Sequence, residues 1–342
     1  MAQVVERPLW EREVPGSSPG APKMLMSTHA PRASVFNRFH LPAETAEEYT
    51  EAGIKTVLSS VIRPDFPFDK LVLSANFRTA TDGCLLLEAQ VQTQNTWSNF
   101  FKLALLSRKF KTSFPSQKNT FGQVETDQLV LSVSAQAYRY RLRFYGDVEL
   151  LLLASSGVRA PFVYDEKSDR LPSVPFRQQL FPISQMEQDI PHKRRICSPT
   201  SLCMALNALG YRVDLAHLLP RVFDQTADVY GNWVFNCAAA AELGAEAFFY
   251  RFTSLAELAT KVTPDSCVIA SIAFKKEKLP GAPLERTPGH LVLIRGWQPG
   301  HVLVADPAAP TADTVLRAYP APAFAKAWLE NKQGAAYIVR RK

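Results

Sequence analysis

The chain has 342 residues, of which 46% are hydrophobic and 21% are charged, a composition typical of a folded protein with two domains. Its net charge of +7 is spread along the sequence without an aromatic-rich basic stretch, which argues against nucleic-acid binding. No apolar run reaches the length of a membrane span. The five cysteines lack the Cys-x-x-Cys spacing of a structural zinc site and the density of a disulfide framework.

The first half of the chain combines a polar start with a β-rich region. Residues 1–34 are rich in Pro, Ser and Gly and are predicted to form a flexible tail. They contain no apolar core of the signal-peptide type, so the chain as written is expected to be cytoplasmic. Residues 35–156 predict an all-β sandwich, because short β-type runs follow one another between polar turns, at 70–77, 84–93, 98–107, 127–135 and 138–144.

The run at 138–144 alternates strictly between arginines and apolar side chains. Arg139, Arg141 and Arg143 fall on one face, and this period of two indicates a half-buried strand. We interpret the arginine face as the solvent-exposed side of the sheet. The alternative is a ligand surface, for a glycan or a cell-surface molecule.

A change of composition separates the two halves of the chain. Residues 157–182 hold four prolines among polar side chains and are predicted to be a linker. Residues 183–342 have a mixed α and β pattern and form the second predicted domain. Its first helix is expected to use Ser198 as N-cap, Pro199 as first helical residue and Gly210 as the closing C′ residue.

The remaining elements of the second half follow from similar patterns. Helices are predicted at 235–244 and 255–262, and a buried strand at 266–274. Two further strands, 290–297 and 301–307, are joined by Gln298-Pro299-Gly300, which is typical of a hairpin turn. Trp233 and Trp297 are interpreted as core residues in preference to residues that line a cleft.

One of the cysteines stands at the start of the predicted first helix. A thiol there is exposed to the positive end of the helix dipole and to unpaired N–H groups, which favour the nucleophilic thiolate. Cys197 therefore occupies an activating position. Cys203 and Cys237 lie within predicted helices and Cys267 lies in an apolar strand, so these three are interpreted as packing residues.

A nucleophilic cysteine needs a base, and the base needs an orienting group. The predicted hairpin places His290 and Asp306 at facing positions, where the carboxylate fixes the tautomer of the imidazole. Gly289 leaves room for a substrate backbone. Taken singly, the histidine is more often a structural residue and Asp-Pro is more often a turn. Together with Cys197, the two residues indicate nucleophilic catalysis.

Five segments of the second half resemble bacterial cysteine peptidases of family 39, which are papain-like proteins related to bacteriocin leader-processing domains. These segments are SQM (184–186), CSPTSLCMAL (197–206), GNWVFN (231–236), TPGHLVLIRGW (287–297) and VLVADPAAP (302–310). The chain is most similar to the stand-alone family 39-like proteins, in which a β-sandwich precedes the peptidase domain. The resemblance implies a papain-like peptidase domain over residues 183–342 and a peptide or protein substrate.

The resemblance also implies roles for individual residues. Cys197 is the expected nucleophile, His290 the general base and Asp306 its orienting group, with no cofactor and no metal. Gln185 is expected to complete the oxyanion hole with the backbone N–H of Cys197, and Gln188 is the alternative donor.

The sequence departs from the family in ways that bear on substrate and location. Ser198 stands where many members have Gly, which puts the substrate range in question. The leader-processing relatives are fused to transporters, so their double-glycine specificity is not transferred, and close relatives are often exported. Two alternatives to peptide hydrolysis stay open: acyl transfer to an amine, as in phytochelatin synthases, and a non-catalytic glycan-binding or cell-surface protein.

Overall fold

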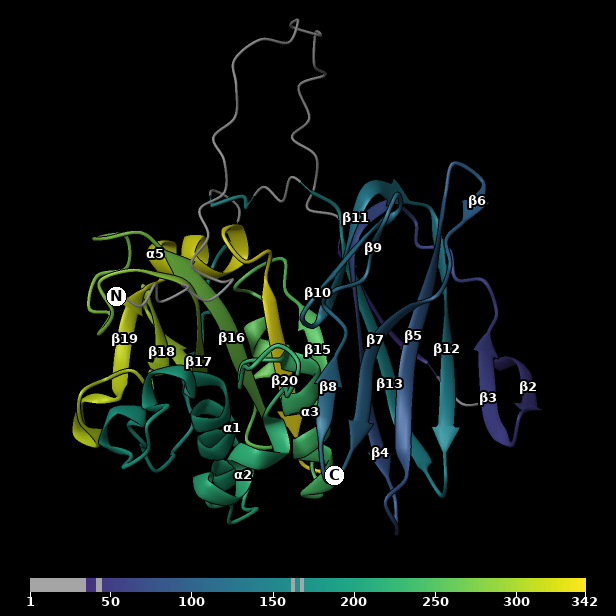
Figure 1. The fold of residues 1–342 in the computed structure, drawn as a ribbon. Helices are drawn as coiled ribbons and strands as arrows, with labels where there is room; N and C mark the ends of the chain where they lie inside the picture. The colour runs from purple at the N-terminus through teal and green to yellow at the C-terminus, as the bar shows by residue number, and fades with distance from the viewer. Residues whose placement is uncertain (1–34, 41–44, 161–163, 167–168) are drawn as a thin grey trace, which may run out of the picture.

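A computed structural model describes residues 35–40, 45–160, 164–166 and 169–342; the predicted tail, residues 1–34, lies outside this part of the chain. Two antiparallel sheets come from the first half of the sequence, and a third sheet with helices comes from the second half (Figure 1). The two-domain, sheet-rich organisation is thus confirmed. No helix among the described residues is long and apolar enough to cross a membrane.

The two sheets of the first half contain all five strands expected there. One sheet has the order β1 (Val35–His40), β13 (Glu149–Val158), β4 (Phe68–Arg78), β11 (Gln128–Ala135), β10 (Gly122–Glu125), β9 (Lys118–Asn119). The other has the order β2 (Thr45–Glu51), β3 (Ile54–Ser59), β12 (Ala137–Tyr145), β5 (Cys84–Thr93), β7 (Phe101–Ser107), β8 (Lys111–Ser113), with β6 (Thr96–Trp97) paired to β5. Most of their buried apolar side chains belong to one core, which continues into the second half of the chain.

The arginine face of β12 is bound within its own sheet. Arg139 donates to Gln90, and Arg141 forms two hydrogen bonds with the buried carboxylate of Glu88, at 2.6 and 3.0 Å. Arg143 contacts Glu51 at 3.2 Å. The alternating arginines of β12 are thus explained by hydrogen bonds and ion pairs with neighbouring strands of the same sheet. A glycan ligand for this domain has no support.

The sheet of the second half is also antiparallel and carries the helices. Its order is β15 (Glu246–Arg251), β20 (Ala335–Arg340), β16 (Ser266–Phe274), β17 (Thr287–Gln298), β18 (His301–Ala305), β19 (Leu316–Pro320). The main helices are α1 (Cys197–Ala208), α2 (Leu215–Val222) and α3 (Trp233–Glu242), and α5 (Ala321–Ala325) continues into a π-helical turn, η6 (Lys326–Glu330). Short 3-10 turns are η3 (Gln185–Glu187), η4 (Lys193–Arg195) and η5 (Ala312–Thr314).

The predicted helix at 255–262 is too long. Only α4, Leu258–Lys261, is helical. The carboxylate of Asp169 accepts hydrogen bonds from the backbone N–H groups of Leu255 and Ala256, at 2.8 and 3.3 Å. Because a distant side chain binds these groups, the segment before Leu258 is fixed by tertiary contacts.

The predicted linker is partly incorporated in the third sheet. β14 (Phe176–Arg177) pairs with β17 opposite Gly296 and Trp297, so ordered structure of the second half begins before residue 183. Gly296 has a φ of 148°, and a Cβ there would lie 1.9 Å from the carbonyl oxygen of Phe176. The pairing therefore depends on a glycine in β17, which the composition of the linker does not reveal.

The two halves are joined along β4, where every residue from Leu71 to Phe77 is buried. Asn76 exchanges two hydrogen bonds with the backbone of Ala247, at 2.6 and 3.0 Å, and the hydroxyl of Ser74 accepts from the N–H of Phe249 at 3.0 Å. A strand covered on both faces is expected to read as a continuous run of buried residues.

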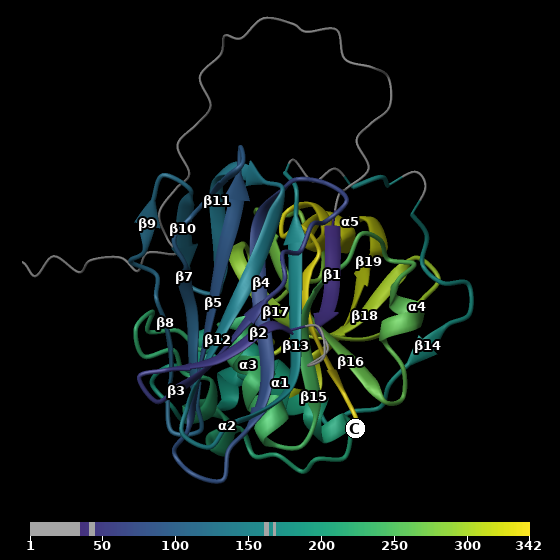
Figure 2. The same cartoon turned by 90° about the vertical axis from the view of Figure 1, so that its right-hand side faces the viewer.

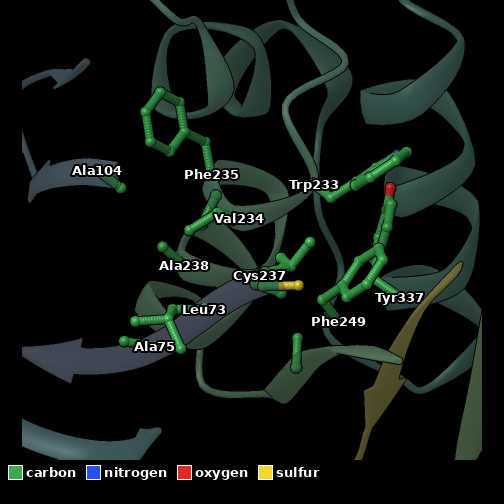
Figure 3. Packing of buried hydrophobic residues seen from close by; sticks show 14 of the residues in the cluster. Leu73, Ala75, Ala104, Trp233, Val234, Phe235, Cys237, Ala238, Phe249 and Tyr337 are labelled. Atoms are coloured by element: carbon green, nitrogen blue, oxygen red, sulfur yellow. The ribbon is translucent and has the colours of Figure 1, made fainter. Parts of the chain in front are cut away.

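Helix α3 packs directly on this strand. Figure 3 shows Leu73 and Ala75 of β4 beside Val234 and Ala238 of α3, and all four are buried. Figure 2 gives the second view of this arrangement, with β4 and β13 next to β15 and α3. The two domains therefore share an extensive interface. The β-sandwich fold of the first domain and the papain-like fold of the second stay predictions.

Candidate active site

Cys197 is the first residue of α1, two positions earlier than the sequence pattern suggested. The N-cap is Ile196, without a side-chain cap, which corrects the prediction that Ser198 caps the helix and Pro199 begins it. The Ser198 hydroxyl instead hydrogen-bonds to that of Tyr337 at 3.0 Å, inside the core. The helix therefore starts with the cysteine among uncapped N–H groups.

The end of α1 and its contact with the sheet fix the position of this cysteine. Gly210 has a φ of 90°, and Tyr211 donates to the carbonyl of Leu206 at 3.0 Å, the expected glycine-terminated cap. Ser201 donates to the carbonyl of Leu291 at 3.2 Å. Because Leu291 follows His290, this bond places the start of the helix against the β17 segment that carries the histidine.

His290 and Asp306 are brought together across the hairpin. His290 Nε2 lies 2.7 Å from Asp306 Oδ1, and both side chains are buried. The register differs from the predicted one, because Gln298 pairs with His301 and a bulge follows between Ile294 and Gly296. Asp306 lies one residue beyond β18, so the contact is diagonal, and such neighbours lie within reach of long side chains.

Two further groups bind the carboxylate of Asp306. The hydroxyl of Tyr319 donates to Oδ2 at 2.6 Å and the backbone N–H of Ala308 donates to Oδ1 at 2.9 Å. Burial by itself raises the pKa of this carboxyl, but the charge of His290 and these hydrogen bonds lower it below its usual value. Sequence reasoning missed Tyr319, since nothing local links β19 to residue 306.

The same contacts determine the protonation of His290 and Cys197. Burial lowers the pKa of His290, but Asp306 and Cys197 outweigh it and raise this pKa to about 10. Burial raises the pKa of the Cys197 thiol, but a hydrogen bond with His290, its charge and a backbone hydrogen bond at Leu291 lower it overall. Because Nε2 faces Asp306, Nδ1 is the ring nitrogen left for the sulfur. The arrangement favours a thiolate beside an imidazolium.

The two glutamines proposed from the sequence differ in their contacts. Gln185 is buried, its backbone N–H donates to Pro307 at 2.9 Å, and its Oε1 has no hydrogen-bond partner among the described residues. Gln188 donates its side-chain N–H to the carbonyl of Ser184 at 2.9 Å, within its own turn. Gln185 is thus tied to the residue after Asp306, whereas the amide of Gln188 is engaged elsewhere.

A cleft of about 440 Å³ opens at Cys197, and both halves of the chain line it. The first half contributes the turn between β10 and β11, and the second half contributes Cys197, Trp233, Gly289, Leu291 and Lys332, among others. A larger hollow of about 610 Å³ lies beside α2 and does not include Cys197. Sequence reasoning missed the contribution of the first half, because no local pattern marks that turn.

The two tryptophans have different positions. Trp233 stacks on Phe249 with ring centroids 4.9 Å apart and also lines the cleft, so it is both a packing and a cleft residue. Trp297 is buried and donates its indole N–H to the carbonyl of Val174 at 2.7 Å. The core interpretation therefore holds for Trp297 and is incomplete for Trp233.

Three of the other cysteines lie in apolar surroundings. Burial raises the pKa values of Cys203 and Cys267 to about 12 and raises that of Cys237 well above its usual value. A buried thiol with a raised pKa is a poor nucleophile. These environments agree with their interpretation as packing residues.

Comparison with known proteins follows the same division of the chain. Residues 175–336 match the model of the Peptidase_C39 like family, and residues 19–150 match the Peptidase C39 N-terminal domain. No curated protein matches the chain.

Two solved structures are similar to about half of the chain at low identity. The first is a double glycine motif protease from an AMS/PCAT transporter, in complex with the leader peptide: it is 19% identical, with a TM-score of 0.35, and the match covers 51% of this chain and 99% of that one. The second, from Bacillus anthracis, is described as a C39-like peptidase and is 18% identical, with a TM-score of 0.37, over 50% of this chain and 98% of that one. On the two family models, the chain belongs to the peptidase C39-like family and carries the C39 N-terminal domain ahead of the peptidase region.

Proposed function

We propose that the chain is a cysteine peptidase that cleaves amide bonds through an acyl-enzyme. Cys197 is the nucleophile, His290 the acid and base, and Asp306 the orienting carboxylate. The observation that carries the proposal is the buried contact of 2.7 Å between His290 and Asp306, next to a thiol whose pKa is lowered by His290. The same arrangement of nucleophile, base and orienting group is the basis of cysteine and serine hydrolysis.

The reaction follows from these protonation states. The Cys197 thiolate attacks the carbonyl carbon of the substrate, and the developing oxyanion is bound by the backbone N–H of Cys197 and the side chain of Gln185. His290 gives its Nδ1 proton to the leaving amine, and the C–N bond breaks to leave a thioester. The neutral imidazole then takes a proton from water, and the resulting hydroxide attacks the thioester. Release of the acid restores thiolate and imidazolium.

The surroundings of the sulfur support a peptide as the substrate. The cleft is open, about 440 Å³ in volume, and bordered by Gly289, whose missing side chain allows a peptide backbone to approach. One of the similar structures is bound to a leader peptide. We assign a β-sandwich to the first half and a papain-like domain to the second half. The double-glycine specificity of that relative is not transferred to this chain.

A labelling experiment tests this proposal. The protein is treated with substoichiometric iodoacetamide at pH 6, and modified peptides are mapped by mass spectrometry in wild type and His290→Ala. We expect selective labelling of Cys197 that is lost in the variant, because the imidazolium stabilises the thiolate. His301→Ala, on the same hairpin and partly exposed, is the matched control and should label like wild type. Equal labelling of all five cysteines, or no effect of His290→Ala, would refute the proposal.

A further inference from the structure

A second, smaller hollow of about 160 Å³ adjoins the cleft at Cys197. The two share Gln128, Trp233 and Lys332 as lining residues, so only these side chains lie between them. The smaller one is also built by both halves of the chain, with Lys70 on β4 and Arg251 at the end of β15. We call it the cationic pocket, after these two residues and Lys332.

Arg251 is a buried charge with unused bonding capacity. Its side chain is 2% exposed. Its guanidinium donates to the carbonyls of Gln333 at 3.1 Å and Lys332 at 3.4 Å, and to Oε1 of Gln128 at 3.4 Å. Its Nε is buried with no hydrogen-bond partner among the described residues. The hydrogen-bond acceptors of this guanidinium are all neutral oxygens, and a buried arginine without a carboxylate partner among the described residues favours an anionic ligand.

The charges around the pocket are not balanced. Burial and the charge of Arg251 lower the pKa values of both Lys70 and Lys332. The charge of Lys332 lowers the pKa of Lys70 further. Nearby acids raise both values and offset this lowering only in part. Glu330 also lines the pocket, and the buried Asp127, whose pKa is raised by burial to about 7, accepts a hydrogen bond from the backbone N–H of Trp233 at 3.0 Å. Three cations therefore line the pocket against one carboxylate, that of Glu330, and a bound anion would relieve the remaining repulsion.

Lys332 connects this pocket with the reacting residues. Its ammonium donates to the carbonyl of Pro288 at 3.4 Å and lies 3.7 Å from the position that a Cβ on Gly289 would occupy. Gly289 directly precedes His290 and lines the cleft. A peptide that passes over Gly289 toward Cys197 therefore runs beside the ammonium of Lys332.

We propose that the cationic pocket is a carboxylate-binding subsite of the peptidase cleft, formed by Lys70 of the first domain with Arg251 and Lys332 of the second. It would bind an acidic side chain or the C-terminal carboxylate of the peptide. This assignment rests on the proposed function. It gives the N-terminal domain a direct part in substrate selection, because Lys70 and Gln128 belong to that domain.

The test uses three small compounds that differ only in their carboxylates. N-acetyl-glutamate α-amide carries the side-chain carboxylate alone, N-acetyl-glutamine carries the main-chain carboxylate alone, and N-acetyl-glutamine amide carries neither. Binding to the full chain is measured by saturation-transfer NMR in wild type, Lys332→Gln and Lys70→Gln. Lys276→Gln is the control, since Lys276 is exposed and pairs with Glu285. Thermal unfolding verifies that each variant is folded.

We expect the neutral compound not to bind and at least one acid to bind, with a loss of about tenfold or more in either pocket variant. The acid that binds identifies the carboxylate as a side chain or a C-terminus. Equal binding of all three compounds, no binding, or binding unchanged in both variants would overturn the subsite. The bound acid should also slow iodoacetamide labelling of Cys197. Binding without this protection would mean that the pocket is not part of the substrate cleft, and it would overturn the proposal. Because NMR binding needs no reactive thiol, failure here is distinguishable from failure of the proposed function.

Discussion

Replacing Asp306 with asparagine is the sharpest perturbation of the site. The change keeps the size of the side chain and removes one buried charge that lies 2.7 Å from His290 Nε2. Tyr319 and Ala308 also bind this carboxylate, and a hydroxyl can accept as well as donate, so the asparagine has partners in place. The fold should therefore survive the substitution.

The magnitude follows from the contact that is lost. A hydrogen bond to a charged group contributes about 1.5–3 kcal/mol, so the pKa of His290, which is about 10 in the native protein, should fall by about one to two units. The balance between thiolate–imidazolium and thiol–imidazole then moves toward the neutral pair by about ten- to hundredfold. Direct repulsion between Asp306 and the thiolate has the opposite sign, but it is the smallest of the influences on Cys197.

The assay is the rate of iodoacetamide alkylation of Cys197 between pH 4 and pH 10, followed by peptide mass mapping. Wild type should react at pH 6, where a free cysteine with a pKa of about 8.5 is almost unreactive. Asp306→Asn should react about tenfold or more slowly at pH 6, with the acid limb of its profile moved to higher pH. Asp313→Asn, exposed in η5, should leave the profile unchanged. Superimposable profiles of Asp306→Asn and wild type would refute the reasoning.

Other substitutions separate further parts of the molecule. Gln185→Ala should lower the rate of acyl-enzyme formation about 10²–10³-fold and Gln188→Ala should have little effect, as measured by single-turnover kinetics; the reverse order would exchange their roles. Lys111→Met should cost about 2 kcal/mol in urea unfolding, because it removes the 2.6 Å contact of the buried Glu242 carboxylate, which keeps only Arg221 at 3.1 Å. Since burial raises the pKa of Asp127 to about 7, native stability should decline as the pH rises from 4 to 7, by up to about 4 kcal/mol. Asp127→Asn should remove that decline, and an unchanged slope would contradict it.

Local sequence patterns determined most of the elements and singled out the candidate site residues. The strand at 266–274, the glycine that ends α1 and the hairpin at Pro299-Gly300 were all predicted where the structure has them. Each depends on a few adjacent residues, because burial periodicity and positive φ values are properties of short segments. The placement of Cys197 at a helix start was predictable for the same reason, although its cap was not.

Other features depend on contacts between segments far apart in the sequence, and only the tertiary structure decided them. Tyr319 reaches Asp306 from a third strand, and the bulge near Gly296 sets the diagonal contact with His290. Lys70 and Gln128 line a pocket whose other residues come from the second half of the chain. Such contacts depend on strand register and on the packing of one domain against the other, and neither leaves a periodic signal in the residues involved.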